Sequence, residues 1–410
     1  MKLNNSTINT ILAISAIKYI VMCFFGEYIK TQLFTMPELT TAASSFKRMT
    51  EGLYLYSKGV SPYQGNVCHQ SPLLLLVFQL LNDSEYLINL IFVLADAFTA
   101  INIAKTLKLR NLSGIKLIEN ETTLDISEQT IAILYMCNPY SGAISLVKST
   151  SIFEYASITA AILSALKGNV IPCAFWISIA SFLGLYPILL AIPLGLLVSQ
   201  NLVKTKNIGI FAMFLGLFLS TFHFLSVMIY GQEYLKATFG LIIGFTDLHP
   251  NIGVYWYFFM EMFKEFEIFF LAVFHLNTMV FIAPITYKFR DDPLFATSFI
   301  MGIMASLKAY PSWGDLGLAL TYLIMNEELL KYLQYVFPGA GLIVAGSILS
   351  PSFWKLWIVL GSGNANFYYA ATLVYNLGIL LLVVDFASAK ARRNIDMKFQ
   401  NARTKKIYQK

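Results

Sequence analysis

The chain has 410 residues, of which 57% are hydrophobic and only 13% are charged, and its net charge is +6. Soluble domains carry about 25% Asp, Glu, Lys and Arg. The composition therefore excludes a soluble enzyme, a disordered chain and a disulfide-stabilised scaffold. It indicates an all-α, multispanning membrane protein with room for about twelve helices of about 20 residues each.

Apolar segments alternate with polar or Pro/Gly-containing breaks along the whole chain. Strands are disfavoured because the apolar runs are long and lack a period of two. Some of the segments are short or interrupted, which a membrane protein tolerates where helices pack on protein or line a cavity. We predict twelve spans, at residues 8–25, 86–104, 129–147, 150–166, 170–184, 187–199, 208–228, 266–287, 293–308, 310–325, 332–348 and 366–386.

The polar segments define the expected organisation. We predict one membrane domain over residues 1–388, with a luminal loop at 26–71 and a cytosolic loop at 105–128, followed by a disordered basic tail at 389–410. A basic tail directly after an apolar span is typical of the cytosolic side, next to anionic lipid, rather than of nucleic-acid binding. An even number of spans then places both termini in the cytosol.

The first loop contains two unusual segments. Residues 44–58 place Phe46, Met49, Leu53 and Tyr56 on one helical face. This amphipathic helix either lies in the membrane surface or packs on its own bundle. The apolar run that follows, Pro72 to Leu81, is too short to span a bilayer and is typical of a re-entrant or interfacial segment.

Three charged residues lie within or close to the predicted spans. A charge inside the membrane costs at least about 2.5–3.5 kcal/mol on insertion scales, so a partner is expected. We predict a structural pair between Asp96 and Lys18 if the first two spans pack antiparallel, with a substrate or proton-relay role as the alternative. Lys148, at the non-cytosolic end of its span, is a candidate phosphate contact, although snorkelling explains it equally well.

Asparagine and small residues precede the last predicted span, in GSGNANFYYA (Gly361–Ala370). The start of a helix offers free backbone N–H groups and the positive end of the helix dipole, which suit an anionic head group. Asn364, Asn366, Phe367 and Tyr368 are therefore candidate lipid-binding residues. The alternative is an N-cap followed by interfacial aromatics. A second aromatic stretch, Trp256 to Phe263, is predicted to contact partner subunits or the membrane interface.

Cysteine and histidine patterns predict no chemistry of their own. The four cysteines form no CxxC pair, and the four histidines are scattered. Cys68 neighbours His69, but adjacency in sequence is not the geometry of a catalytic pair. We predict no metal site, no cofactor and no catalytic residue.

Several motifs together resemble the PIG-U family, the multispanning subunit of the glycosylphosphatidylinositol (GPI) transamidase, in its fungal form. They are SSFKRMTEGLYLYSKGVSPYQG, SPLLLLVFQLL, LADAFTAINIA, NPYSGAISLVKST, HPNIGVYWYFFMEMF, LKAYPSWGD and PSFWKLWIVLGSGNANFYYA. They extend from the first loop to the last span.

The resemblance implies a noncatalytic subunit in the endoplasmic reticulum membrane. The complex removes a C-terminal signal from precursor proteins and joins the new carboxyl end to the ethanolamine of a GPI lipid. A caspase-like cysteine protease subunit carries the nucleophile, and PIG-U-like subunits bind and present the lipid among the membrane phospholipids. Holding one reactant in place can supply about 7–11 kcal/mol of a reaction barrier.

The arrangement EG, GVSPY and SPLLL is also similar to the first loop of dolichol-phosphate-dependent mannosyltransferases. This implies a GT-C-like membrane scaffold. Those enzymes use paired acidic residues early in this loop, whereas the corresponding stretch here, FTMPELTTAASSFKR, contains only Glu38, with no second acid before Glu51. An active sugar transferase that uses Glu38 is the alternative function, and a transporter or scramblase, supported only by Asp96 and Lys18, is a third.

Overall fold

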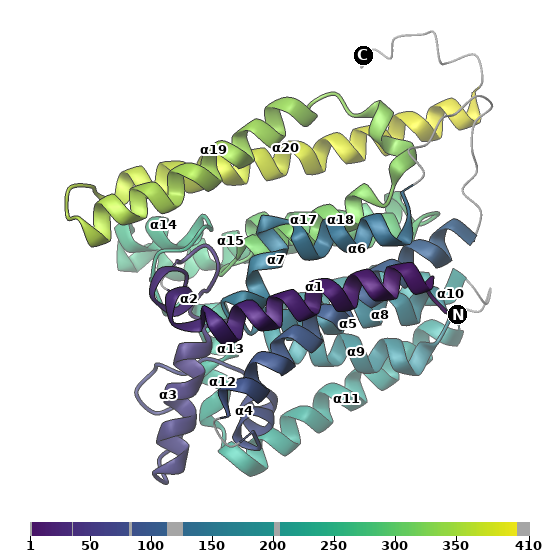
Figure 1. Ribbon diagram of the computed structural model, residues 1–410. Coiled ribbons are helices and arrows are strands. Elements are labelled where there is room, and N and C mark those ends of the chain that lie inside the picture. The colour runs from purple at the N-terminus through teal and green to yellow at the C-terminus, as the bar shows by residue number, and fades with distance from the viewer. Residues whose placement is uncertain (1, 35, 82–83, 113–125, 201–205, 400–410) are drawn as a thin grey trace.

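The computed structural model describes residues 2–34, 36–81, 84–112, 126–200 and 206–399, and within these residues the chain is helical without any strand (Figure 1). The all-α class is therefore confirmed. The first half contains α1 (Asn5–Phe24), α2 (Gly26–Gln32), α3 (Phe46–Ser57), α4 (Pro72–Gln79), α5 (Glu85–Leu112), α6 (Glu128–Cys137), α7 (Pro139–Leu146), α8 (Ser151–Leu166), α9 (Val170–Gly184) and α10 (Ala191–Gln200). The second half contains α11 (Lys206–Tyr230), α12 (Glu233–Ala237), α13 (Phe239–Gly244), α14 (Tyr255–Glu261), α15 (Glu267–Met279), α16 (Ile282–Lys288), α17 (Pro293–Leu307), α18 (Trp313–Ile324), α19 (Val336–Trp354) and α20 (Ala365–Lys398).

Six helical segments in the described part of the chain are long and apolar enough to cross a membrane: Asn5–Phe24, Glu85–Leu112, Asn207–Tyr230, Lys264–Lys288, Val336–Val359 and Ala365–Lys398. Four shorter apolar helices accompany them. Helical structure lies at each of the twelve predicted segments. Twelve crossings and the GT-C-like scaffold nevertheless remain predictions, because shorter helices do not by themselves reach across a bilayer.

The predicted span at 129–147 is broken in the middle. α6 ends at Cys137, and the Asn138 side chain accepts a hydrogen bond of 2.9 Å from the backbone N–H of Tyr140, at the start of α7. Pro139 occupies the first position of α7. The backbone N–H at this position has no acceptor within a helix, so proline loses no hydrogen bond there. The Asn-Pro step therefore ends one helix and begins the next.

The helices differ sharply in burial. Nearly every residue of α8 and α17 is buried, so these two helices lie in the core. By contrast, only 6% of the most apolar window of Asn207–Tyr230 is buried. Apolar side chains exposed in this way suit contact with lipid.

α19 and α20 lie side by side along most of their length (Figure 1). Glycines permit this approach: a Cβ atom at Gly346 would lie 2.7 Å from Cβ of Tyr375, and one at Gly378 would lie 2.8 Å from the backbone nitrogen of Ile343. Without a hydrophobic driving force between helices in lipid, close packing over small residues holds such pairs together.

The predicted amphipathic helix is α3, and it packs on its own protein. Met49 is fully buried, and the ring of Phe46 makes edge contacts with those of Phe78 and Phe92, at 5.4 Å between centroids in both cases. Of the two alternatives, the structure therefore favours packing on the bundle. The short apolar run after it forms α4.

Two predicted boundaries are wrong. The loop expected from residue 105 begins later, since α5 continues to Leu112. The tail expected to be disordered from residue 389 is helical as far as Lys398, because Lys390 at the end of α20 pairs with Asp292 at 2.5 Å and so is held against the bundle. Residues 113–125 and 400–410 of these predicted segments lie outside the described residues.

The ends of the bundle differ in what they carry. Figure 1 shows the start of α1 and the end of α20 at one end, on the right, with α2, α3 and α14 at the other. α3 and α14, which carry motifs predicted to be luminal, therefore lie at the end opposite the start of α1 and the end of α20.

Candidate functional site

The candidate lipid-binding residues lie at the first turn of α20. Asn364 is the N-cap, and its side-chain oxygen accepts a hydrogen bond of 3.3 Å from the backbone N–H of Phe367. Gly361, with φ of +66°, turns the chain just before it. Asn364, Asn366 and Phe367 are exposed, the last with 55% of its surface accessible. The turn thus presents two carboxamides and an aromatic ring at the surface.

Asn366 is tied to α14 by a hydrogen bond that the hydroxyl of Tyr257 donates to its side-chain oxygen. The ring of Tyr257 also stacks on that of Tyr369, with 4.6 Å between ring centroids. The aromatic stretch and the start of the last helix therefore form one structural unit.

Tyr368 is buried behind this surface in a cluster of aromatic rings. Its ring centroid lies 5.8 Å from that of Trp256, 5.5 Å from Trp354 and 6.4 Å from Trp357. Residues Lys355–Val359 form a π-helical turn, a distortion that is common at functional sites. The fourth candidate residue supports the site from behind rather than facing outward.

Only part of the aromatic stretch behaves as an exposed surface. Trp256 and Phe259 are buried in the chain's own core, whereas Met260, Glu261 and Phe263 are exposed. For these three exposed residues, contact with partner subunits or the interface remains a prediction.

Glu38, in the loop after α2, forms a hydrogen bond to the first turn of α20. Its side-chain Oε1 accepts a hydrogen bond of 3.2 Å from the Tyr368 hydroxyl, and its backbone oxygen accepts one of 2.8 Å from the N–H of Trp313. The side chain is 0% exposed, and Oε2 has no hydrogen-bond partner among the described residues. Burial raises the pKa of Glu38 to about 7, although the hydrogen bond from Tyr368 favours the charged form.

Lys148, the candidate phosphate contact, is paired with a carboxylate. It is 5% exposed, and its ammonium lies 3.3 Å from Oε1 of Glu85 at the start of α5. Its backbone is in the left-handed region, with φ of +52°. Among the described contacts, nothing joins Lys148 to the four candidate residues of α20, so a shared phosphate site remains a prediction.

The predicted intramembrane pair is present. The ammonium of Lys18 on α1 lies 2.6 Å from Oδ2 of Asp96 on α5, and both side chains are buried. The hydroxyl of Ser145 donates to the same carboxylate oxygen at 3.3 Å. The predicted pairing of these two charges is therefore present, and their structural role in the membrane remains a prediction.

Comparison with known proteins gives the family. The model of the PIG-U family, described as GPI transamidase subunit PIG-U, matches residues 12–375. The GPI-anchor transamidase component PIGU of Cricetulus griseus is 33% identical over 385 residues, covering 87% of each chain. The GPI transamidase component GAB1 of Saccharomyces cerevisiae is 33% identical over 406 residues, covering 98% of this chain and 99% of its own length. The corresponding homolog of Schizosaccharomyces pombe is 31% identical over 386 residues, covering 92% and 93%. Since both the family model and these relatives span most of its length, this chain belongs to the PIG-U family.

Proposed function

We propose that this chain is a noncatalytic subunit of a GPI transamidase complex in the endoplasmic reticulum membrane, with both termini cytosolic, and that it binds the GPI lipid for attachment to precursor proteins. The observation that carries the proposal is the similarity over nearly the whole chain to proteins named as components of that transamidase. The bundle end opposite the termini would then face the lumen, where the protein substrates are.

The cysteines support a noncatalytic role. Cys68, the one beside a histidine, is fully buried, and burial raises the pKa of its thiol to about 11. A nucleophilic cysteine needs a lowered pKa and an accessible sulfur. This supports the proposal that the nucleophile belongs to another subunit, a caspase-like cysteine protease.

The start of α20 is the proposed GPI contact. Its exposed carboxamides, Asn364 and Asn366, can hydrogen-bond to phosphate and sugar oxygens, while Phe367 offers an apolar face to acyl chains or sugar rings. The aromatic cluster behind it keeps this surface rigid, which favours positioning.

Purification in mild detergent tests the assignment to the complex. We expect the tagged full chain to bring down a caspase-like protease, detected by mass spectrometry, together with GPI lipid, detected in the extracted lipids. A preparation that retains neither, although the chain elutes as a single folded species, would overturn the proposed function.

A substitution at the proposed contact tests the site. Asn366→Lys removes the hydrogen bond from Tyr257 and adds a longer cationic side chain at the surface. We expect anchor attachment in cells to fall on the order of tenfold, since small displacements of a positioned reactant have large effects on rate, while recovery of the complex stays unchanged. Asn364→Lys, which also removes the N-cap, is expected to behave similarly.

Asn169→Lys is the matched control for these variants. Asn169 is also an exposed residue that precedes a helix, but it lies before α9 and makes no capping hydrogen bond. This variant should attach anchors normally. Normal attachment by the Asn366 variant as well would show that the site assignment is wrong.

A further inference from the structure

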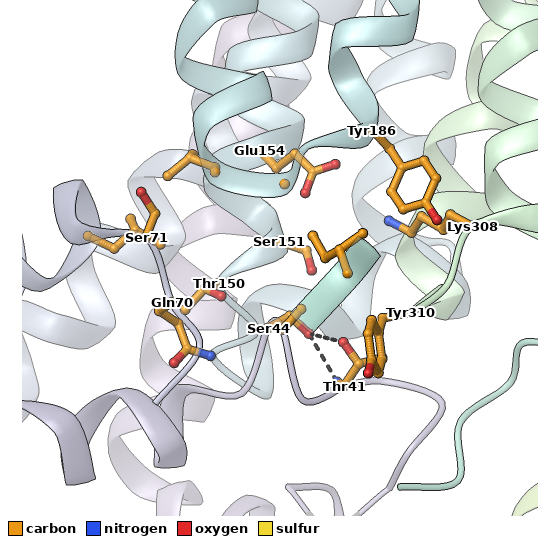
Figure 2. A pocket seen from close by; sticks show the side chains of 15 residues that line it. Thr41, Ser44, Gln70, Ser71, Thr150, Ser151, Glu154, Tyr186, Lys308 and Tyr310 are labelled. Atoms are coloured by element: carbon orange, nitrogen blue, oxygen red, sulfur yellow. Dashed lines mark hydrogen bonds between the residues drawn. The ribbon is translucent and has the colours of Figure 1, made fainter. Parts of the chain in front are cut away.

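A small polar cavity lies near the end of the bundle that carries α2 and α3, between the chain after α2 and the ends of α8, α9 and α17 (Figure 2). It has a volume of about 40 Å³. A cavity of this volume holds at least one water molecule, so a small polar group can enter it.

Glu154 is the unexplained group of this cavity. It lies on the first turn of α8, an otherwise apolar helix, and it is only 8% exposed. Figure 2 shows its carboxylate on the side of Lys308 and Tyr186. Within the described part of the chain, it accepts no hydrogen bond and has no cation within 4 Å. A buried carboxylate with free acceptors is rare in folded proteins and points to a missing donor.

The Glu154 carboxylate packs against Gly184, the last residue of α9, which has no side chain. A Cβ atom at position 184 would overlap Oε2 of Glu154. The next residue, Leu185, turns the chain with φ of +49°, so the wall of the cavity is formed by a strained turn. Any side chain at position 184 would therefore displace the carboxylate.

The other polar groups around the cavity are mostly occupied. The ammonium of Lys308 donates to Asp315 at 2.7 Å, while the hydroxyl of Tyr186 accepts from the N–H of Ala309 at 2.9 Å. The hydroxyl of Tyr310 donates to the backbone oxygen of Asp247 at 2.8 Å. Of the two charged groups that line the cavity, Lys308 has an ion-pair partner and Glu154 has none within the described residues.

The charges select the kind of ligand. Lys308 is already paired with Asp315, so the Glu154 carboxyl has no cation of its own among the described residues. An anion is therefore disfavoured. A divalent metal is disfavoured as well, because the described residues contain no group of three or more His, Cys, Asp or Glu side chains that could hold one. A primary ammonium, with one positive charge and three donors, supplies both missing features.

We propose that this cavity receives the primary ammonium end of a phosphoethanolamine group, with Glu154 as its counter-ion. The ammonium end of this group is small enough to enter the cavity. A membrane offers this chemistry in phosphatidylethanolamine, and a GPI lipid offers it in its ethanolamine phosphates. Only the second source rests on the proposed function.

The cavity is connected to the start of α20 by a short series of contacts. Lys308 holds Asp315, whose carboxylate accepts from the N–H of Ser312 at 2.7 Å. The next residue, Trp313, donates its N–H to Glu38, which holds Tyr368. A head group at Glu154 and a lipid at Asn366 would thus be bound by parts of one rigid assembly.

Binding of two short-chain lipids tests the proposal. The full chain, purified with whatever subunits it retains, is placed in phosphatidylcholine nanodiscs and titrated with dihexanoylphosphatidylethanolamine or dihexanoylphosphatidylcholine, with apparent Tm as readout. The second lipid has the same phosphate but a quaternary amine without N–H donors. We expect only the first to raise Tm. A soluble mannose–phosphoethanolamine conjugate forms a second arm, and tighter binding of that compound identifies the glycolipid as the source.

Two substitutions connect binding to the cavity. Glu154→Gln keeps the size of the side chain but removes its charge, and should weaken binding of the ethanolamine compound about 10- to 100-fold, the value of a charged hydrogen bond. Gly184→Ala should weaken binding similarly by displacing the carboxylate. Gly209→Ala, at a helical glycine with open space around it, is the matched control and should bind normally.

The outcomes separate the two proposals. Equal responses of the unsubstituted protein to both lipids, with no response to the conjugate, would overturn the ammonium site even if neither variant folds. Binding that survives Glu154→Gln in a folded sample would do the same. Neither result affects the proposed function, which fails instead if no transamidase subunit co-purifies.

Discussion

Replacing Asp96 by Ala is expected to destabilise the folded chain by about 3–5 kcal/mol, because the Lys18 ammonium would remain buried without a counter-charge. The ammonium now lies 2.6 Å from the Asp96 carboxylate and 3.4 Å from the Ser145 hydroxyl. Lys18→Ala should be similarly harmful, since it leaves the carboxylate unpaired. The measurement is the yield of monodisperse protein and its apparent Tm in detergent.

The double variant Lys18→Met with Asp96→Leu provides the decisive comparison. Replacing a buried pair by apolar residues of similar volume is often neutral, so most of the lost stability should return. Glu128→Gln is the control, since its pair with Lys108 is more exposed, with 16% and 24% of the two side chains accessible, and its loss should change stability by at most about 1 kcal/mol. A double variant as unstable as the single ones would contradict a structural pair.

This experiment also tests the alternative roles of the pair. A double variant that is stable and assembles but fails in anchor attachment would indicate that the charges act on substrate or carry protons. A structural pair predicts normal attachment by the stable double variant.

Glu38→Gln is expected to stabilise the chain above neutral pH. The buried carboxyl of Glu38 has a pKa near 7 in the folded chain, against 4.5 for its ordinary value. Because its pKa is higher in the folded chain than in the unfolded chain, folding favours the protonated carboxyl. The stability that this carboxyl contributes is fully present below pH 4.5 and is lost as the pH rises through about 7. At pH 8, the wild type therefore carries a penalty on the order of 2–3 kcal/mol that the neutral Gln variant lacks.

The measurement is apparent Tm from pH 5 to pH 8.5. The difference between Glu38→Gln and the wild type should grow with pH and level off above about pH 7. Tyr368→Phe should move the transition of the wild-type Glu38 to higher pH, because it removes the hydrogen bond that favours the carboxylate. A difference that does not change with pH would show that Glu38 does not titrate in this range.

The same variant separates the two candidate functions. A sugar transferase that used Glu38 as its base would lose activity in Glu38→Gln, whereas a lipid-presenting subunit should still support anchor attachment. The complete enclosure of Glu38, which does not line the polar cavity, argues against such a catalytic role.

Sequence patterns located the helices well where the signal is local. The predicted segment 170–184 is α9 residue for residue, and 150–166 differs from α8 by one residue. In both, Gly or a charged residue ends an apolar run, which is how a helix end is encoded. The Asn-Pro step inside 129–147 also carried a visible signal, although we predicted a single span there.

Tertiary pairing accounts for what the sequence did not reveal. The link between Glu38 and Tyr368 joins positions 330 residues apart, and no local pattern encodes it. The end of α20 was predicted to be disordered because its composition is basic, but its pairing with Asp292 is visible only in three dimensions. Glu154 is different. It lies within the predicted span 150–166, and a glutamate inside a span is itself a sequence signal of an intramembrane charge.

The length of α20 has a mechanical consequence. Thirty-four residues of α-helix extend about 51 Å, some 20 Å more than the hydrocarbon thickness of a bilayer. The helix is fastened near both extremities, by Tyr368 to Glu38 and by Lys390 to Asp292. α20 therefore cannot tilt as a rigid helix without breaking one of these two contacts. A force on its basic C-terminal end would be transmitted to the aromatic N-terminal end.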